Sequence, residues 1–393
     1  MTYLDHAATT PPHPRAVQVL TEELAAGGNP SSLHTSGRRA RRVVEESRER
    51  IAAAIGAAPN EVVLTAGGTE ADNLALKGLY WARRGQDPRR RRVLLSAVEH
   101  HAVVDPAVWL HEHEDAELVW IPVDGQGLLD TDVLRAEVER DPGSVALVSV
   151  MWANNEVGTI QPVDDVVAAC APHGVPVHTD AVQAVGHLPV DVAASGVDAL
   201  TLSGHKLGGP VGAGALVVRA GLEVTPVLHG GGQERGIRSG TLDTPAVAAL
   251  SVAVEEAVAD LAAEAERVSA LRDRLVAGVL EAVPDAVLRG APLGPGRLPG
   301  NAYLTFPGCQ GDSLLYLLDA RGIECSTGSA CQAGVPQPSH VLLAMDVPDD
   351  HVRGGLRFSL GRTSTDVDVK TLVEEIGPVV ERARSAGLAG RAR

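Results

Sequence analysis

Residues 198–220 read DALTLSGHKLGGPVGAGALVVRA, two short apolar runs separated by a glycine-rich turn that carries one lysine. The chain has 34 lysines and arginines, and only Lys77, Lys206 and Lys370 among them are lysines. Arginine stays protonated, whereas a lysine partly stripped of water can lose its proton and attack a carbonyl carbon. Lys206 follows a predicted strand directly, and it is therefore a candidate nucleophilic amine.

One pattern of apolar runs and helical stretches continues from about residue 60 to 220. Short Val-rich runs bounded by Gly or Pro alternate with helical stretches, as in EVVLTAG followed by TEADNLALKGLYWARR. Further apolar runs are RRVLLSAVE, SVALVSVMW and GVPVHTD. This alternation predicts an α/β fold with a mostly parallel sheet covered by helices on both faces.

The pattern of apolar residues changes after this region. Residues 254–283 keep apolar side chains at a three-four spacing with Glu and Arg between them, which predicts one long helix that Pro284 ends. Strand NAYLTF, helix GDSLLYLLDARG, a loop of small residues, helix PSHVLLAMDV and strand LRFSLG follow. We therefore expect a large α/β domain over 13–253 and a smaller α+β domain made of 1–12 and 254–393.

Composition excludes several classes of protein. Hydrophobic residues make up 45% of the 393 residues and charged residues 21%, which indicates a globular chain with a full core. The formal net charge of -16 argues against direct binding of nucleic acid. No signal peptide or membrane-spanning run is visible, and the spacing of the four cysteines is typical of neither a zinc site nor a disulfide framework. We expect a cytoplasmic protein that holds no metal.

Polar residues follow the predicted strands, where ligands bind in folds of this kind. Asp180 ends one strand and Lys206 follows another, which is the arrangement that a pyridoxal phosphate site requires. Gly67 and Gly68 precede a predicted helix and could form a turn that binds phosphate. A glycine turn with a threonine N-cap is also a common structural feature without any ligand. His100 follows a strand too, but a lone histidine is more often structural.

Two features of the smaller predicted domain also suggest chemistry. Cys331 lies in GIECSTGSACQAGVPQPSH among small and hydroxyl residues, which favours an exposed, reactive thiol over a packed one. Pairing of Cys325 with Cys331 as a redox couple is the second interpretation. LRFSLGR contains Arg357 and Arg362, and a guanidinium group suits the carboxylate of an amino acid substrate. The alternative interpretation is that these arginines form surface salt bridges.

With these residues assembled, the chain resembles the cysteine desulfurases of the IscS/NifS type, within the class V aminotransferase-like, fold-type I pyridoxal phosphate enzymes. The resemblance covers nearly the whole chain, and the sequence is most similar in character to actinobacterial members of the family. It rests on ordered motifs: YLDHAATTP, GNPSSLH, GGTEADNLA, EHHAV, ANNEVGTIQP, HTDAVQAVG, SGHKLGGPVGAGAL, HGGGQERGIRSGTL, STGSAC and LRFSLGR. It implies a seven-stranded sheet in the large domain. Gln332 departs from the family, which usually has a small hydroxyl residue after the reactive cysteine.

The resemblance also implies roles for individual residues. Lys206 would hold pyridoxal 5'-phosphate as a Schiff base and move protons on the substrate, and His100 would stack on the ring and act in proton transfer. Cys331 would attack the sulfur of L-cysteine. Asn155 and Arg357 would bind the substrate carboxylate. Cofactor contacts are implied for Lys206, Asp180, Gln183, His100, Gly68, Thr69, Ser203, His205, Asn155 and Thr241.

The implied reaction releases L-alanine and leaves a persulfide on Cys331. Thr241 would reach the phosphate in the neighbouring subunit, which implies a homodimer. Sulfur acceptors would be an iron-sulfur scaffold or a tRNA thiolation enzyme. A selenocysteine lyase, or another β-eliminating class V enzyme, is the alternative activity, and a catalytically silent sulfur carrier is an alternative of a different class.

Overall fold

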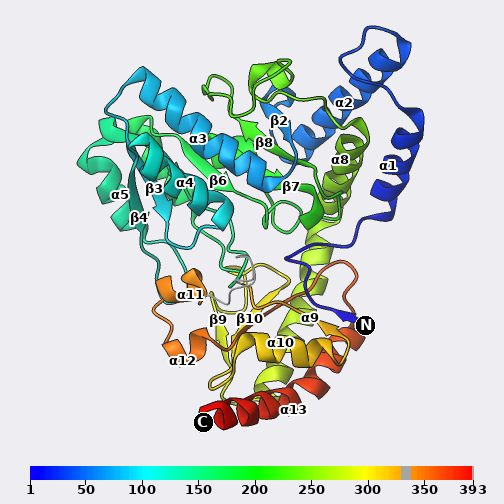
Figure 1. Cartoon of the computed structure of the whole chain (residues 1–393), viewed down its shortest axis with the longest axis vertical. Helices are drawn as coiled ribbons and strands as arrows, with labels where there is room; N and C mark the ends of the chain where they lie inside the picture. Colours follow the sequence, from blue (N-terminus) through cyan, green and yellow to red (C-terminus); the bar gives the residue numbers. More distant parts are fainter. Residues whose placement is uncertain (329–337, 392–393) are drawn as a thin grey trace.

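The computed structural model describes residues 1–328 and 338–391. Figure 1 shows a larger upper part, built on one sheet with helices on both sides, and a smaller lower part that contains both ends of the chain. Helix α9 (Leu261–Ala282) runs between the two parts. The site described below lies where these parts meet.

The larger part is built on a seven-stranded sheet with the order β2-β8-β7-β6-β5-β3-β4. The five strands from β7 to β4 are parallel to one another, whereas β8 is antiparallel to both β2 and β7. The sheet is thus mostly parallel, as the sequence predicts. Its strands are β2 (Val62–Thr65), β3 (Arg92–Ser96), β4 (Glu117–Ile121), β5 (Val145–Ser149), β6 (Val177–Asp180), β7 (Ala199–Ser203) and β8 (Gly214–Val218).

The apolar side chains of the sheet enter two separate cores. Val62 and Leu64 face one core with α2, α5, α6 and α8, and Val63 faces the other with α3 and α4. This two-sided burial explains why the strands read as continuous apolar runs rather than as alternating ones. The helices of this part are α1 (Pro14–Ala26), α2 (Thr35–Ala54), α3 (Gly68–Gln86), α4 (His101–Glu114), α5 (Thr131–Arg140), α6 (Val163–Cys170), α7 (Val192–Ser195) and α8 (Thr244–Ala259).

The smaller part has its own core. Its three-stranded antiparallel sheet has the order β12-β10-β9, and one core gathers apolar side chains of α9, α10, α13 and the strands. The first residues of the chain belong here, because β1 pairs in parallel with β11 and Leu4 is buried in the same core. The remaining elements are β1 (Thr2–Tyr3), β9 (Val287–Arg289), β10 (Asn301–Thr305), α10 (Gly311–Asp319), β11 (Ile323–Glu324), α11 (His340–Ala344), α12 (Asp349–Val352), β12 (Gly355–Ser359) and α13 (Asp366–Arg391).

One sequence prediction is wrong in detail. The single helix expected over 254–283 is two helices, because α8 ends at Ala259 and α9 begins at Leu261. Asp260 between them has φ −105° and ψ 13°, outside helical geometry. Aspartate is a weak residue for a helix interior because its short carboxylate competes for backbone hydrogen bonds. The apolar spacing continues across the break, and this continuity explains why the pattern reads as one helix.

Among the described residues, no helix is both long enough and apolar enough to cross a bilayer.

Candidate active site

A cavity of about 310 Å³ lies at the carboxyl ends of the parallel strands, between the larger and the smaller part of the molecule. Its lining comes from both parts of the molecule: Asp5, Ser326 and Arg357 belong to the smaller one. Ten of the predicted site residues line it together: Gly68, Thr69, His100, Asn155, Asp180, Gln183, Ser203, His205, Lys206 and Arg357. Residues scattered over almost 300 positions of sequence are thus brought into one pocket.

Lys206 enters the pocket from a short 3-10 turn (Gly204–Lys206) that directly follows β7. Its Nζ donates hydrogen bonds to the backbone oxygens of Ala7, at 2.8 Å, and Ala8, at 2.9 Å. Gln183 donates to the same Ala7 oxygen at 3.0 Å. The N-terminal segment therefore positions the amine, although nothing in the side chains of two alanines signals such a role.

Asp180 ends β6 and is buried, so its carboxyl lies where the neighbouring parallel strands also end. Burial raises its pKa to about 6, while the Val182 N–H that donates to Oδ1 at 2.9 Å and the charge of Lys206 act in the opposite direction. A buried carboxylate of this kind is stabilised by a cationic partner. A protonated ring nitrogen would be a partner of that kind.

His100 is the N-cap of α4, and its Nδ1 accepts the Ala102 N–H at 3.1 Å. Burial lowers its pKa to about 4, and the charge of Lys206 lowers it further. The ring is therefore neutral at pH 7. Because Nδ1 is an acceptor, the proton of the neutral ring lies on Nε2.

Gly68 and Thr69 form the first turn of α3, a helix of 19 residues. The first amides of a helix have no partner within it, and they carry partial positive charge toward a bound anion. Ser203 and His205 line the pocket beside this turn. The preceding Gly67 has φ +139°, a backbone conformation that favours glycine and lets the chain turn into the helix. This arrangement suits a phosphate group.

Arg357 lies on β12 with its guanidinium pointing into the pocket region. It donates to the backbone oxygen of Asn155 and to Asp5 Oδ1, both at 2.9 Å. Its Nε is buried and has no acceptor among the described residues. A buried donor without a partner is costly, so this group favours an anionic ligand such as a carboxylate.

Two buried carboxyl groups were missed by the sequence analysis. Asp72, on the second turn of α3, lines the pocket, and His178 Nε2 lies 3.6 Å from its Oδ1. Glu99 accepts the Met151 N–H at 2.6 Å. Burial raises the pKa of both carboxyls, and the charge of Asp180 raises both further. Asp72 lies within the quoted motif GGTEADNLA, so its position, though not its burial, was visible in the sequence.

Comparison with known proteins adds the family. Residues 2–372 match the model of the family described as aminotransferase class-V. An IscS-like cysteine desulfurase of Mycobacterium tuberculosis is 55% identical over 389 residues, which cover 99% of this chain and 98% of that protein. The chain belongs to the class V aminotransferase family. Within it, the chain is of the IscS/NifS type of cysteine desulfurase, which confirms the resemblance read from the motifs.

Solved structures agree with this family. A NifS-like protein superimposes with a TM-score of 0.89 at 33% identity and covers 97% of this chain and 100% of its own. A protein described as SspA in complex with cysteine gives a TM-score of 0.79 at 31% identity, covering 93% of this chain and 100% of its own. The predicted fold class, a fold-type I α/β architecture with a smaller second part, is confirmed.

Enzymes of this family depend on pyridoxal 5'-phosphate, as the sequence analysis expected. The pocket fits that group by three observations: an amine at Lys206, an acid of raised pKa at Asp180, and a helix N-terminus for the phosphate at Gly68. The cavity of about 310 Å³ reaches all three. Lys206, Asp180, Gln183, His100, Gly68, Thr69, Ser203 and His205 are the residues that would hold it.

Some predicted residues are not in the pocket. Thr241 is exposed and does not line it, and Arg362 lines a different cavity. Cys331 and Gln332 lie outside the described residues. Cys325 is a buried free thiol whose pKa burial raises to about 12. A thiol with such a pKa is not ionised at pH 7 and is a poor nucleophile.

Proposed function

We propose that this chain takes sulfur from L-cysteine at the pocket around Lys206, releases L-alanine and holds the sulfur on Cys331 before passing it to an acceptor. The activity is that of its family. The observation that carries the assignment of residues is the convergence of Lys206, Asp180, His100 and Arg357 on one cavity. A related structure is described as a complex with cysteine, which supports this substrate.

When bound, pyridoxal phosphate supplies an electron sink for the negative charge that develops on the substrate carbons. Asp180, buried at the strand end, would face the ring nitrogen and favour its protonated form. Lys206 would bond the cofactor and later carry protons at the α and β carbons, since two backbone carbonyls already fix its Nζ. The Nε2 proton of neutral His100 would be available for donation in the same pocket.

Substrate orientation would fall to Arg357 and Asn155. The guanidinium of Arg357 has one buried N–H without an acceptor, and Asp5 and the Asn155 carbonyl hold its two terminal nitrogens. A carboxylate of cysteine would accept from this group and from the Asn155 side chain. Because the guanidinium is anchored before substrate arrives, little entropy would be lost in ordering it.

The sulfur transfer step would involve Cys331 as its thiolate. Its Sγ would form a bond to the sulfur of cysteine while the carbon-sulfur bond breaks. The electron pair of that bond would remain on carbon and take up a proton, which gives alanine, and the sulfur would remain on Cys331 as a persulfide. An iron-sulfur scaffold or a tRNA thiolation enzyme would accept it, in the reducing cytoplasm where free thiols such as buried Cys170 and Cys309 persist.

We also propose that the working enzyme is a homodimer. Thr241 lies exposed, away from the pocket of its own chain. It would complete the phosphate contacts of the partner subunit. Equilibrium sedimentation tests the dimer, and loss of cofactor from a Thr241→Ala dimer tests the contact.

The decisive experiment compares two lysines. Lys206→Ala should abolish the visible absorbance of the cofactor-lysine linkage, its bleaching by borohydride, and alanine formation from cysteine. Lys370→Ala is the matched control, because Lys370 is an exposed lysine of α13 that forms an ion pair with Glu374 on the same helix. A Lys206→Ala protein that kept both the borohydride-sensitive band and the activity would contradict the proposal.

A second variant separates the role of the thiol. Cys331→Ser should retain the cofactor absorbance and its response to cysteine but lose sulfide release in the presence of a reductant. Assays with selenocysteine beside cysteine test the alternative lyase activity, since a lyase would keep turning over selenocysteine without a thiol acceptor. Normal sulfide release by Cys331→Ser would remove Cys331 from the mechanism.

A further inference from the structure

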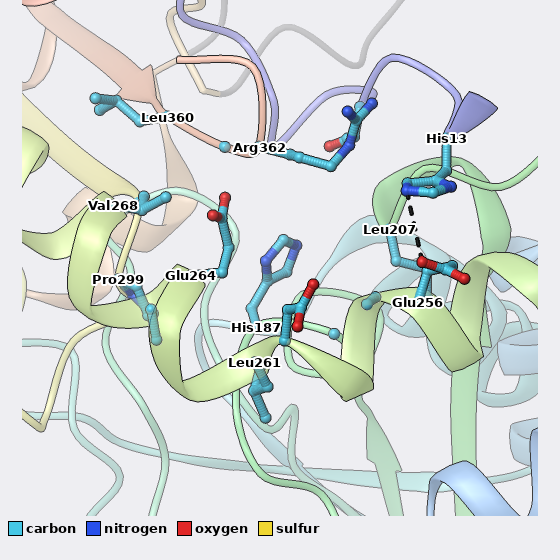
Figure 2. A pocket seen from close by; sticks show the side chains of 17 residues that line it. His13, His187, Leu207, Glu256, Leu261, Glu264, Val268, Pro299, Leu360 and Arg362 are labelled. Carbon is cyan, nitrogen blue, oxygen red and sulfur yellow. Dashed lines mark ion pairs between the residues drawn. The ribbon is translucent and has the colours of Figure 1, made fainter. Parts of the chain in front are cut away.

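A second cavity, of about 140 Å³, lies at the junction of α8 and α9, and we call it the hinge cavity. Figure 2 shows it bounded below by the helical junction and above by the segment that carries Leu360 and Arg362, with His187 near its centre. No residue lines both this cavity and the pocket around Lys206. It is therefore a separate feature of the molecule.

The hinge cavity lies behind the loop that carries the catalytic lysine. Leu207, the next residue along, is part of its wall. The N-terminal residues that line it are bonded to the same loop: the Thr10 N–H donates to the His205 oxygen and the His13 N–H to the Gly208 oxygen, both at 2.8 Å. A ligand in this cavity would contact both the lysine loop and the smaller part of the molecule.

Most charged groups of the cavity are already paired. Glu256 forms an ion pair with Arg15, and His13 lies 3.7 Å from its other oxygen, as the dashed line in Figure 2 marks. Glu264 accepts two hydrogen bonds from Arg267, at 2.8 and 2.9 Å. Burial lowers the pKa of His187, so this ring brings no charge at pH 7. These groups need no ligand.

Two charges remain, one on each wall. Within the described residues, neither Asp260 nor Arg362 has an ion-pair partner, although both line the cavity. Among the described residues, the acceptors of the Arg362 side chain are the backbone oxygens of Pro11 and Pro12, at 3.3 and 3.4 Å. Asp260 lies between α8 and α9, at the helical junction, and Arg362 lies on the facing segment, as Figure 2 shows; both residues are exposed. The cavity thus presents one free anion and one free cation, both open to solvent.

The cavity that both residues line is small and largely apolar. Leu207, Val268 and Leu360 contribute buried aliphatic surface. A protein cavity of roughly 150 Å³ admits benzene, a molecule of six heavy atoms. L-Alanine also has six heavy atoms, with an ammonium group, a carboxylate and one methyl. The size, the two opposite charges and the aliphatic wall all suit a molecule of this kind.

We propose that the hinge cavity is a second binding site, for a small zwitterionic α-amino acid, with Asp260 facing its ammonium group and Arg362 facing its carboxylate. Binding would join the helical junction to the facing segment through one ligand and fix the wall beside the lysine loop. The site would differ from the reactive one because it would hold its ligand by non-covalent contacts alone, with no bond to a cofactor.

The test uses holoenzyme whose cofactor has been reduced onto Lys206 with borohydride, so that an amino acid can no longer react in the first pocket. Mass spectrometry confirms the reduction; failure at this step would concern the function proposed above and not the hinge cavity. L-Alanine, ethylamine and propionate are then titrated by calorimetry. We expect saturable one-to-one binding of L-alanine, and binding at least tenfold weaker for the other two, each of which lacks one charge.

Variants assign the site. Asp260→Asn keeps a residue that starts a helix well, and Arg362→Ala removes an exposed side chain, so both should fold. Each should weaken L-alanine binding at least tenfold. Glu281→Gln and Arg353→Ala are matched controls, exposed and away from the cavity, and should leave it unchanged. Absence of binding to wild-type enzyme, equal binding of ethylamine, or full binding by both site variants would overturn the proposal.

Discussion

Replacing Asp180 with asparagine should stabilise the cofactor-free protein at neutral pH while it removes activity. The pKa of Asp180 is about 6 in the folded chain, against 3.8 for an ordinary aspartate, chiefly because of burial. One pKa unit corresponds to about 1.4 kcal/mol, so the ionised carboxylate costs the folded state about 3 kcal/mol above pH 6. Asparagine keeps an oxygen for the Val182 N–H and carries no charge to bury.

The pH dependence gives the sharper test. A raised pKa means that the folded chain binds the proton more tightly than the unfolded chain, so the contribution of Asp180 to stability is present below pH 4 and is lost as the pH rises through 6. The difference in unfolding free energy, Asp180→Asn minus wild type, should be near zero at pH 4 and reach about 3 kcal/mol at pH 7.5.

Urea denaturation of the cofactor-free proteins, followed by circular dichroism at several pH values, measures this difference. Glu281→Gln is the control, because it replaces a carboxylate that is exposed rather than buried. An Asp180→Asn protein less stable than wild type at pH 7.5, or a difference that does not change with pH, would refute the reasoning. Loss of activity in the same variant is expected from the missing charge opposite the ring nitrogen.

Three further predictions concern single side chains. Glu234→Ala should lower the unfolding free energy by about 3–5 kcal/mol, because the substitution leaves the buried Arg48 guanidinium without the carboxylate that it pairs with. A loss under about 1 kcal/mol in urea titrations would contradict this. Arg357→Lys should raise the KM for cysteine at least tenfold, because an ammonium lacks the fork that reaches Asp5 and the substrate together; unchanged steady-state KM would argue against a substrate contact. Cys325 should resist iodoacetamide at pH 7.5 in the folded protein, and Cys325→Ala should keep its activity; rapid labelling seen by mass spectrometry would disagree with its burial.

The fold and the centre of the site could be predicted because both follow from regular patterns. Apolar runs between helices indicate a parallel sheet, and residues after parallel strands gather at one edge. Asp180 and Lys206 are brought together in this way, and the family and its cofactor are confirmed by the comparisons. The roles of the individual side chains remain predictions.

Other features leave no comparable trace in a sequence. The Ala7 and Ala8 carbonyls that hold Lys206 are backbone groups almost 200 positions away, and every residue has such an oxygen. The burial of Asp72 depends on how α3 lies on the sheet, not on the residue itself. The break at Asp260 is a local backbone choice inside a continuous apolar pattern, and apolar spacing reports which face is buried rather than where a helix ends.

The contact between the first and last parts of the chain has a consequence for biosynthesis. Asp5 accepts a hydrogen bond from Arg357, which is 352 positions later in the sequence, and β1 can pair only after β11 has been synthesised. At about 5–20 residues per second, translation leaves the first residues without these partners for roughly 20–70 s. The sheet of the larger part can form on the ribosome during that interval, but Lys206 gains its fixed position only when the N-terminal segment docks. Stable binding of the vitamin B6 cofactor is therefore expected only after most of the chain has emerged from the ribosome.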